Sequence, residues 1–382
     1  MKAYKLLILA AAAVLVTGAP ALAFHDGGVA ACNGCHTMHN SSNGQPMNYK
    51  ADGTIGGTPV GTGYTDLLLF ANKSDVCLRC HGNNTASYGV WSSDPAAPNA
   101  VRANRGGGDY VFLQEDNIND GRGGATNPIL GHAAGHSVIS GIKNTVADPI
   151  LTTSPGGTFP AAGLACTSCH DPHGTASYRL LYQDGQRVDT ALYTATIVAE
   201  GVALTTSGTG ETPTNPNAYH SGYSAWCGTC HGNFHQKSGN LIHPSGEPLG
   251  SDIATIYNMY KGTTDCIANP PAGGLPCGSG TAATAYLPQV PFLDANATIT
   301  STNGPTSSSQ VACVSCHRAH ATSAPNAGRW DFNVLGMAAD GVNSGSYKIP
   351  NPYDGGQRSL CNKCHSKDEF DAPEDFTPVP VP

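Results

Sequence analysis

The chain carries one short pattern, C-x-x-C-H, six times, and this pattern accounts for twelve of its 14 cysteines. Two thiols at this spacing can form thioether bonds with the two vinyl groups of one haem, and the adjacent imidazole can bind the iron. The sequence therefore predicts six covalently attached haem c groups. The attachment cysteines and proximal ligands, numbered as repeats 1 to 6 in chain order, are Cys32, Cys35 and His36; Cys77, Cys80 and His81; Cys166, Cys169 and His170; Cys227, Cys230 and His231; Cys313, Cys316 and His317; and Cys361, Cys364 and His365.

Two other kinds of site use paired cysteines, and neither explains the repeats. A thioredoxin-like redox pair needs a flanking strand and helix, which a chain with 47 Gly and 27 Pro does not indicate. A zinc site built from C-x-x-C pairs would not require a histidine after every second cysteine. Haem attachment is the interpretation that accounts for all six copies.

Each iron needs a second axial ligand or an open position, and the chain has enough histidines to fill every one. Of its 15 histidines, nine lie outside the repeats. We expect bis-histidine ligation at each iron, with methionine as a less favoured alternative; this leaves no position for a substrate and predicts an electron carrier without a catalytic residue. The distal ligands are expected to be six of His25, His39, His136, His173, His235, His243 and His320.

Some of these histidines follow a repeat directly. On a helical turn, side chains three residues apart lie on one face at a separation of about 5 to 6 Å, so His36 and His39 cannot bind opposite faces of one haem. His39 must serve another haem or none, and the same holds for His173, His320 and, one residue further along, His235. Each such pair ties two haems close together, as a row of electron carriers requires. The repeats that begin at residues 77 and 361 lack this arrangement and must draw on His25, His132, His136, His220 or His243, each of which is as readily a surface histidine.

The remaining sequence indicates a chain that wraps these groups. Gly and Pro are abundant and only 12% of the residues are charged, so a regular polypeptide core is not expected. We predict mostly irregular coil with short helices and few small strands, a multihaem cytochrome c in which residues 24–382 form one domain organised around a chain of six haems. Residues 371–382 read as a mobile Pro-rich tail. The two remaining cysteines predict a disulfide between Cys266 and Cys277.

The first residues indicate export. A basic start, an apolar run of about eleven residues and a small-residue cleavage site predict a signal peptide over residues 1–23. That run is shorter than the roughly twenty residues needed to span a bilayer, and no membrane span is expected elsewhere. The net charge of −8 argues against nucleic acid as a partner.

Five blocks resemble a known family. They are FHDGGVAACNGCHTMHNS at 24–41, CTSCHDPHG at 166–174, WCGTCHGNFH at 226–235, CVSCHRAHA at 313–321 and LCNKCHSKD at 360–368. These blocks are similar to those of the OmcS-type hexahaem outer-surface cytochromes of metal-reducing bacteria, which polymerise into filaments called nanowires.

The resemblance implies a specific assembly. By analogy with that family, His39 would bind the haem of His317 in the next subunit, so that copies of the chain join head to tail without closing into a ring. Electrons would arrive from periplasmic or outer-membrane cytochromes and leave to extracellular acceptors such as metal oxides. The expected location is extracellular or on the outer cell surface, otherwise periplasmic.

Two alternatives stay open from the sequence. One is a discrete periplasmic or cell-surface electron shuttle with the same haems and no polymer. The other is a multihaem reductase with one open iron, for which a lysine in place of a proximal histidine would have been a signal.

Overall fold

Irregular backbone dominates this chain, and each of the six cysteine pairs lies in or beside a short helix. The structure is a computed structural model that describes residues 32–82, 89–95, 106–114, 130–201, 217–235, 245–262, 278–332 and 358–364. The α-helices are α2 (Lys73–His81), α4 (Tyr223–Gly228), α5 (Gly232–His235), α6 (Gly250–Met259), α8 (Cys313–Cys316) and α9 (Arg358–Cys361). The 3-10 helices are η1 (Cys32–Gly34), η2 (Thr65–Leu67), η3 (Tyr110–Leu113), η5 (Gly131–Ala133), η6 (Ala161–Gly163), η7 (Cys166–Ser168), η8 (Tyr178–Leu180), η10 (Ala282–Thr284) and η11 (Pro325–Ala327).

The strands form two small antiparallel sheets, each with two members. Strand β1 (Arg187–Val188) pairs with β2 (Ala191–Leu192), and β3 (Val198–Glu200) pairs with β4 (Ala218–Ser221). The second pairing shifts register between Val198 and Ala199. Residues 190–198 thus contain β2 and the first residue of β3. The predicted fold class of coil, short helices and few strands is confirmed.

Helix α2 shows how the sequence builds a helix around a repeat. The Asn72 side chain caps its N-terminus by accepting from the Ser74 amide at 2.7 Å, and Asp75 lies in the first turn while Arg79 and His81 lie in the last. This charge order complements the helix dipole. The buried Asp75 carboxylate also accepts hydrogen bonds from Ser140 Oγ at 2.5 Å and from the backbone amide of residue 141 at 3.1 Å. These hydrogen bonds attach the helix of repeat 2 to residues 140–141.

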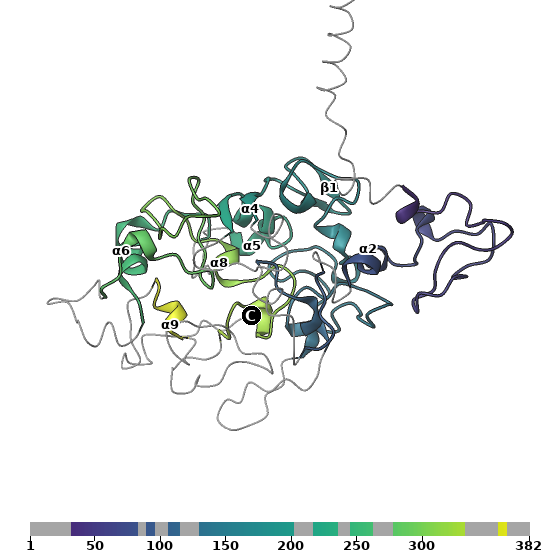
Figure 1. The fold of residues 1–382 in the computed structure, drawn as a ribbon, viewed down its shortest axis with the longest axis horizontal. Coiled ribbons are helices and arrows are strands. Elements are labelled where there is room, and N and C mark those ends of the chain that lie inside the picture. Colours follow the sequence, from purple (N-terminus) through teal and green to yellow (C-terminus); the bar gives the residue numbers. More distant parts are fainter. Residues whose placement is uncertain are drawn as a thin grey trace, which may run out of the picture.

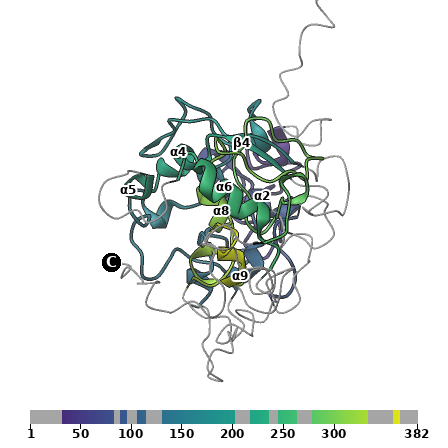
Figure 2. The same cartoon turned by 90° about the vertical axis from the view of Figure 1, so that its left-hand side faces the viewer.

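The elements that carry the repeats follow one another along the long axis of the molecule. In Figure 1 the purple segment with η1 projects at one end, α2 comes next, α4, α5 and α8 lie near the middle, and α6 lies at the opposite end. Figure 2, viewed from the α6 side, shows α6, α8 and α2 one behind another. Helices α2, α4 and α8, which carry cysteines of repeats 2, 4 and 5, are therefore spread along the long axis between these two ends.

Apolar side chains form four separate clusters in place of one continuous core. The clusters contain Leu78, Trp91 and Phe112; Tyr257, Phe292 and Trp330; Tyr193, Trp226 and Leu293; and Leu69, Phe70 and Val76, each with further members. Cysteines of the repeats pack against three of them. The attachment sites thus lie at the borders of the clusters, which agrees with prosthetic groups filling the space between them.

Several predictions of the sequence fall outside the described residues. They concern the signal peptide at 1–23, the tail at 371–382, the Cys266–Cys277 disulfide, and the ligands His25, His243 and His365.

Candidate haem-binding sites

Four proximal histidines donate a hydrogen bond from Nδ1 to a backbone carbonyl oxygen. A carbonyl can only accept, so the proton lies on Nδ1 and the lone pair of Nε2 is left for a metal. Contacts of this kind also fix the orientation of a ligating ring. The distances from Nδ1 to the carbonyl oxygen are 2.9 Å from His36 to Asp66, 2.8 Å from His170 to Arg179, 2.7 Å from His231 to Pro155 and 2.9 Å from His317 to Asn326.

Repeats 1, 3 and 5 reach this carbonyl through the same backbone turn. In repeat 3, Arg179 and Leu180 both have left-handed backbone, with φ of 56° and 58°, and the Asp171 amide donates to the Leu180 carbonyl at 2.8 Å. Left-handed backbone at a residue with a side chain costs roughly 1–2 kcal/mol, so its recurrence indicates a requirement of the site. The same pair of positive φ angles occurs at Asp66 (56°) and Leu67 (55°), and at Asn326 (59°) and Ala327 (53°).

The helical turn expected for the paired histidines of these three repeats is not formed. His36, His170 and His317 each lie in an isolated antiparallel bridge, opposite Leu68, Leu181 and Gly328 respectively. The bond from Nδ1 to the neighbouring turn holds each histidine in extended backbone, so that the short helix ends before the histidine. The inference that the two histidines of one repeat bind different haems does not depend on a helical turn. The positions of the imidazole rings test it directly.

Three pairs of imidazole rings face each other, and each pair joins the proximal histidine of one repeat to a histidine from elsewhere in the chain. Two of the partners, His173 and His320, are the second histidines of repeats 3 and 5, and neither faces the histidine three residues before it. The ring centroids are 6.3 Å apart for His36 and His173, 6.4 Å apart for His170 and His320, and 6.0 Å apart for His231 and His136.

These separations fit a haem iron between the rings. Two imidazoles on opposite sides of one metal, with metal–nitrogen bonds of about 2 Å, place their ring centroids ~6 Å apart. Phe234 also lies 6.2 Å from His231, but it has no donor atom, so distance and chemistry together select His136 as the partner.

Burial keeps the facing imidazoles neutral. It lowers the pKa of His136 to about 4, with the facing His231 as the second cause, and it lowers the pKa of His320 to about 3, with His170 second. His136 Nδ1 donates to the Ala319 carbonyl at 2.6 Å, which again leaves Nε2 for a metal. A neutral ring with a free Nε2 lone pair is the form that ligates iron.

The thiols of consecutive repeats are neighbours from repeat 1 to repeat 4. Burial, followed by the Cys80 thiol, raises the pKa of Cys35. A hydrogen bond between the thiols of Cys77 and Cys166 raises the pKa of the first and lowers that of the second. Burial, followed by the Cys230 thiol, raises the pKa of Cys169 to about 12. The cysteines of repeats 1 and 2, 2 and 3, and 3 and 4 are therefore close enough to influence one another electrostatically.

The same arrangement continues to repeat 6. Cys227 and Cys313 share a hydrogen bond that raises the pKa of Cys227 and lowers the pKa of Cys313 to about 7. Burial, followed by Cys364 and Cys361, raises the pKa of Cys316 to about 12. The contacts alternate between second and first cysteines along the chain. Groups attached to these thiols would lie in a single row in sequence order.

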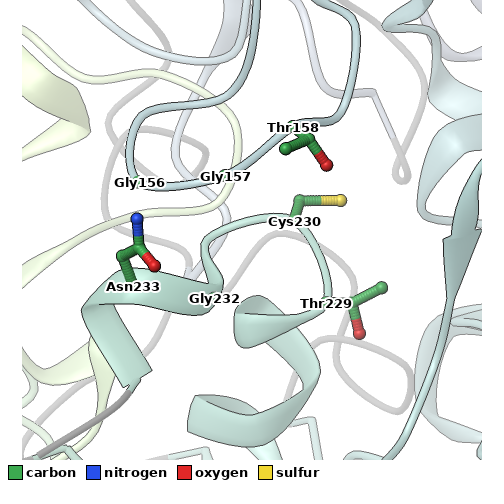
Figure 3. Close-up of a pocket in the computed structure, with 7 residues that line it drawn as sticks. All are labelled: Gly156, Gly157, Thr158, Thr229, Cys230, Gly232 and Asn233. Carbon is green, nitrogen blue, oxygen red and sulfur yellow. The ribbon is translucent and has the colours of Figure 1, made fainter.

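Figure 3 shows the surroundings of one attachment cysteine. The Cys230 side chain lies between the loop at 156–158 and the turn that leads into α5, with its sulfur pointing between Thr158 and Thr229. The hollow beside it has a volume of about 270 Å³. A side chain at Gly157 would overlap the Cys230 carbonyl, since a Cβ there would lie 1.8 Å from that oxygen. Glycine at this position lets the loop close over the cysteine.

The structure places the other candidate ligands as follows. His39 is exposed beside Met38, which is 79% exposed, on the segment that projects at the purple end of Figure 1. His235 ends α5. His132 lines a second hollow of about 160 Å³. His220 directs Nε2 towards Glu200, 3.5 Å from its carboxylate, and Nδ1 towards the Ala295 carbonyl at 3.3 Å. Both ring nitrogens of His220 thus face oxygen atoms.

Sequence reasoning missed the groups that hold the ligands. The acceptors for Nδ1 are backbone carbonyls, whose position no residue type reveals, and the left-handed turns use Asp-Leu, Arg-Leu and Asn-Ala, which share no signature. Tyr110 stacks on His320 with centroids 4.4 Å apart. Lys363, inside repeat 6, is 2% exposed and donates to the carbonyls of Tyr257 and Tyr260 at 2.8 and 3.1 Å.

Within the described part of the chain, no helix combines the length and the apolar character that crossing a bilayer would require.

Comparisons with known proteins agree with the residues of the sites. A family model described as a doubled CXXCH motif matches residues 159–188, which contain repeat 3. The C-type cytochrome OmcS of Geobacter sulfurreducens is 31% identical over an alignment covering 95% of this chain and 98% of that protein.

Two solved structures share the fold. One is described as the outer membrane cytochrome S filament of Geobacter sulfurreducens, with a TM-score of 0.72, and the other as the OmcS nanowires of the same organism, with a TM-score of 0.70. Each is 30% identical to this chain, and each match covers 90% of this chain and all of the solved chain. With cysteines and imidazoles placed for covalent haem and a full-length relative of this similarity, the chain belongs to the OmcS family of c-type cytochromes.

Proposed function

We propose that this chain holds six haem c groups in one row and carries electrons along it, and that copies polymerise head to tail into a filament that delivers electrons to extracellular acceptors. The observation that carries the proposal is that thiols of each repeat interact electrostatically with thiols of the next one, from repeat 1 to repeat 6. Bound haem supplies the iron(III)/iron(II) couple, and the rate of electron transfer falls steeply with distance. A chain that brings every attachment site beside the next one suits conduction.

The axial ligands follow from the facing rings. We assign His36 with His173 to haem 1, His170 with His320 to haem 3, and His231 with His136 to haem 4, each haem being numbered by its repeat. The first two assignments join different repeats, 1 with 3 and 3 with 5, and the third joins repeat 4 to the segment that carries His136. Imidazole on both sides saturates the iron, which supports a carrier over a reductase.

Polymerisation is supported by the exposed His39 and by the family. The two solved structures of the relative are described as a filament and as nanowires. His39 lies on the projecting segment, and we assign it to haem 5, that of His317, in the next copy. This contact repeats in one direction and so builds a filament.

The test is the variant His39→Ala, purified with its haems, with His220→Ala as the matched control. The pyridine haemochrome assay should give six haems per chain for both variants. Electron microscopy of cell-surface material should show filaments for the control and single subunits for His39→Ala. Filaments from His39→Ala would contradict the role of His39, and single subunits from the unaltered protein would favour the discrete shuttle.

A further inference from the structure

His320 differs from His136 in the contact made by its Nδ1. This atom is buried and has no hydrogen-bond partner among the described residues. One face of the ring is covered by Tyr110, at 4.4 Å and 16° between planes. A Cβ on Gly107 would lie 3.0 Å from His320 Nδ1, so the glycine backbone passes close to this nitrogen. The surroundings of Nδ1 are an aromatic face and a glycine, neither of which accepts its proton.

A positive charge lies beside the same pair of rings. The Arg179 carbonyl accepts from His170 Nδ1 at 2.8 Å, and its guanidinium lies 5.3 Å from the Tyr178 ring centroid. No carboxylate in the described part of the chain forms an ion pair with Arg179.

At haem 4, by contrast, the Nδ1 atoms of both proposed ligands are hydrogen-bonded. Both of its proposed ligands donate from Nδ1 to carbonyl oxygens over short distances, 2.7 Å for His231 and 2.6 Å for His136. A donated Nδ1 proton makes the ring a more basic ligand, which stabilises iron(III). An imidazole without an acceptor is less basic, and a nearby cation favours iron(II), whether it acts on the iron or on a propionate.

From this contrast we infer that Arg179 and the unbonded Nδ1 of His320 give haem 3 a higher reduction potential than haem 4. The inference rests on the ligand pairs of the proposed function. Reduction adds one electron to the iron from the neighbouring haem, and no bond is made or broken. Haem 3 would then be reduced before haem 4, and electron transfer from haem 3 to haem 4 would be thermodynamically unfavourable.

Substituting methionine for each distal ligand assigns the potentials. Methionine raises the potential of the haem it binds, so His320→Met and His136→Met each remove one wave from a spectroelectrochemical titration of the haem-loaded protein. We expect the wave removed by His320→Met to lie above the wave removed by His136→Met. The reverse order overturns the inference. Six unchanged potentials and an unchanged low-spin spectrum in His320→Met would instead show that His320 is no ligand, which rejects the ligand assignment itself.

Variants that keep every ligand give the second test. Asparagine tolerates left-handed backbone, so Arg179→Asn removes the charge without disturbing the turn. It should lower the wave assigned to haem 3, whereas Arg179→Lys should keep that wave near its original potential. Arg187→Asn, which removes an exposed arginine on β1, is the control for net charge. A shift in Arg179→Asn no larger than in Arg187→Asn would overturn the role of Arg179.

Discussion

The imidazole rings of His36 and His173 face each other with their planes 11° from parallel, at a centroid distance of 6.3 Å. The other two pairs have similar separations and different orientations: 56° between His170 and His320, and 57° between His136 and His231. Bonds from Nδ1 to backbone oxygens hold four of these rings, those of His36, His170, His136 and His231. The sites thus differ in electronic structure although their ligands are the same.

The ligand orientations predict two kinds of electron paramagnetic resonance signal from the oxidised protein. Near-parallel imidazole planes give a rhombic low-spin spectrum, and strongly tilted planes give a signal with a larger principal g value. We expect His173→Met to remove a rhombic signal. As a comparison, His136→Met should remove a signal of the second kind and leave the rhombic one. Loss of the same kind of signal in both variants would contradict the ring orientations.

The left-handed turn beside repeat 3 predicts opposite effects of two substitutions at Leu180. Its side chain is only partly buried and its φ is 58°. Leu180→Gly should be tolerated, because glycine adopts this backbone without strain. Leu180→Val should reduce the free energy of unfolding by roughly 1–3 kcal/mol, because a β-branched residue at positive φ is strongly disfavoured.

Guanidinium denaturation followed at the Soret band measures this difference. Leu192, which is 44% exposed on β2, offers a control pair, since Leu192→Val should be nearly neutral in a strand. If Leu180→Val proves as stable as Leu180→Gly, the turn does not depend on its backbone geometry.

The low pKa values of His136 and His320 predict that the protein loses stability in mild acid. Their folded-state values of about 4 and about 3 lie below the ordinary 6.5. Between pH 6.5 and about 4 the unfolded chain therefore binds protons that the folded chain does not, so the free energy of unfolding falls as the pH falls. Each histidine contributes a slope of at most about 1.4 kcal/mol per pH unit. Iron binding at Nε2 acts in the same direction.

Denaturant titrations of the haem-loaded protein at several pH values between 7 and 4.5 measure this slope. Methionine does not titrate, so His136→Met should have a shallower slope than the unaltered protein. An equal slope in the two proteins would mean that protonation of His136 does not contribute.

Residue types and spacing were sufficient for the attachment chemistry and for the fold class. The six C-x-x-C-H repeats define the covalent sites because thioether formation depends on a local spacing of two thiols. The abundance of Gly and Pro indicated coil for a similar reason, since these residues disfavour regular elements wherever they stand. The short helices around the repeats and the two small sheets agree with that expectation.

Ring pairing depended on the tertiary structure. His173 lies 137 residues after His36 in the sequence, and nothing in CHDPH indicates that its second histidine faces repeat 1. Spacing could exclude pairing within a repeat, because two side chains three residues apart cannot reach opposite faces of one group. The spacing could not identify the facing imidazole of each histidine, because that depends on the path of the loops between repeats.

The sequence by itself identified the residues expected to attach haem, since that chemistry is local to five consecutive residues. Only the tertiary structure decided which imidazoles face each other and how their Nδ1 atoms are held, because the partners are distant residues and backbone carbonyls. The contrast between His320 and His136 shows the reason: both are histidines near a repeat, and their different surroundings arise from the left-handed turns and loop contacts of the folded chain.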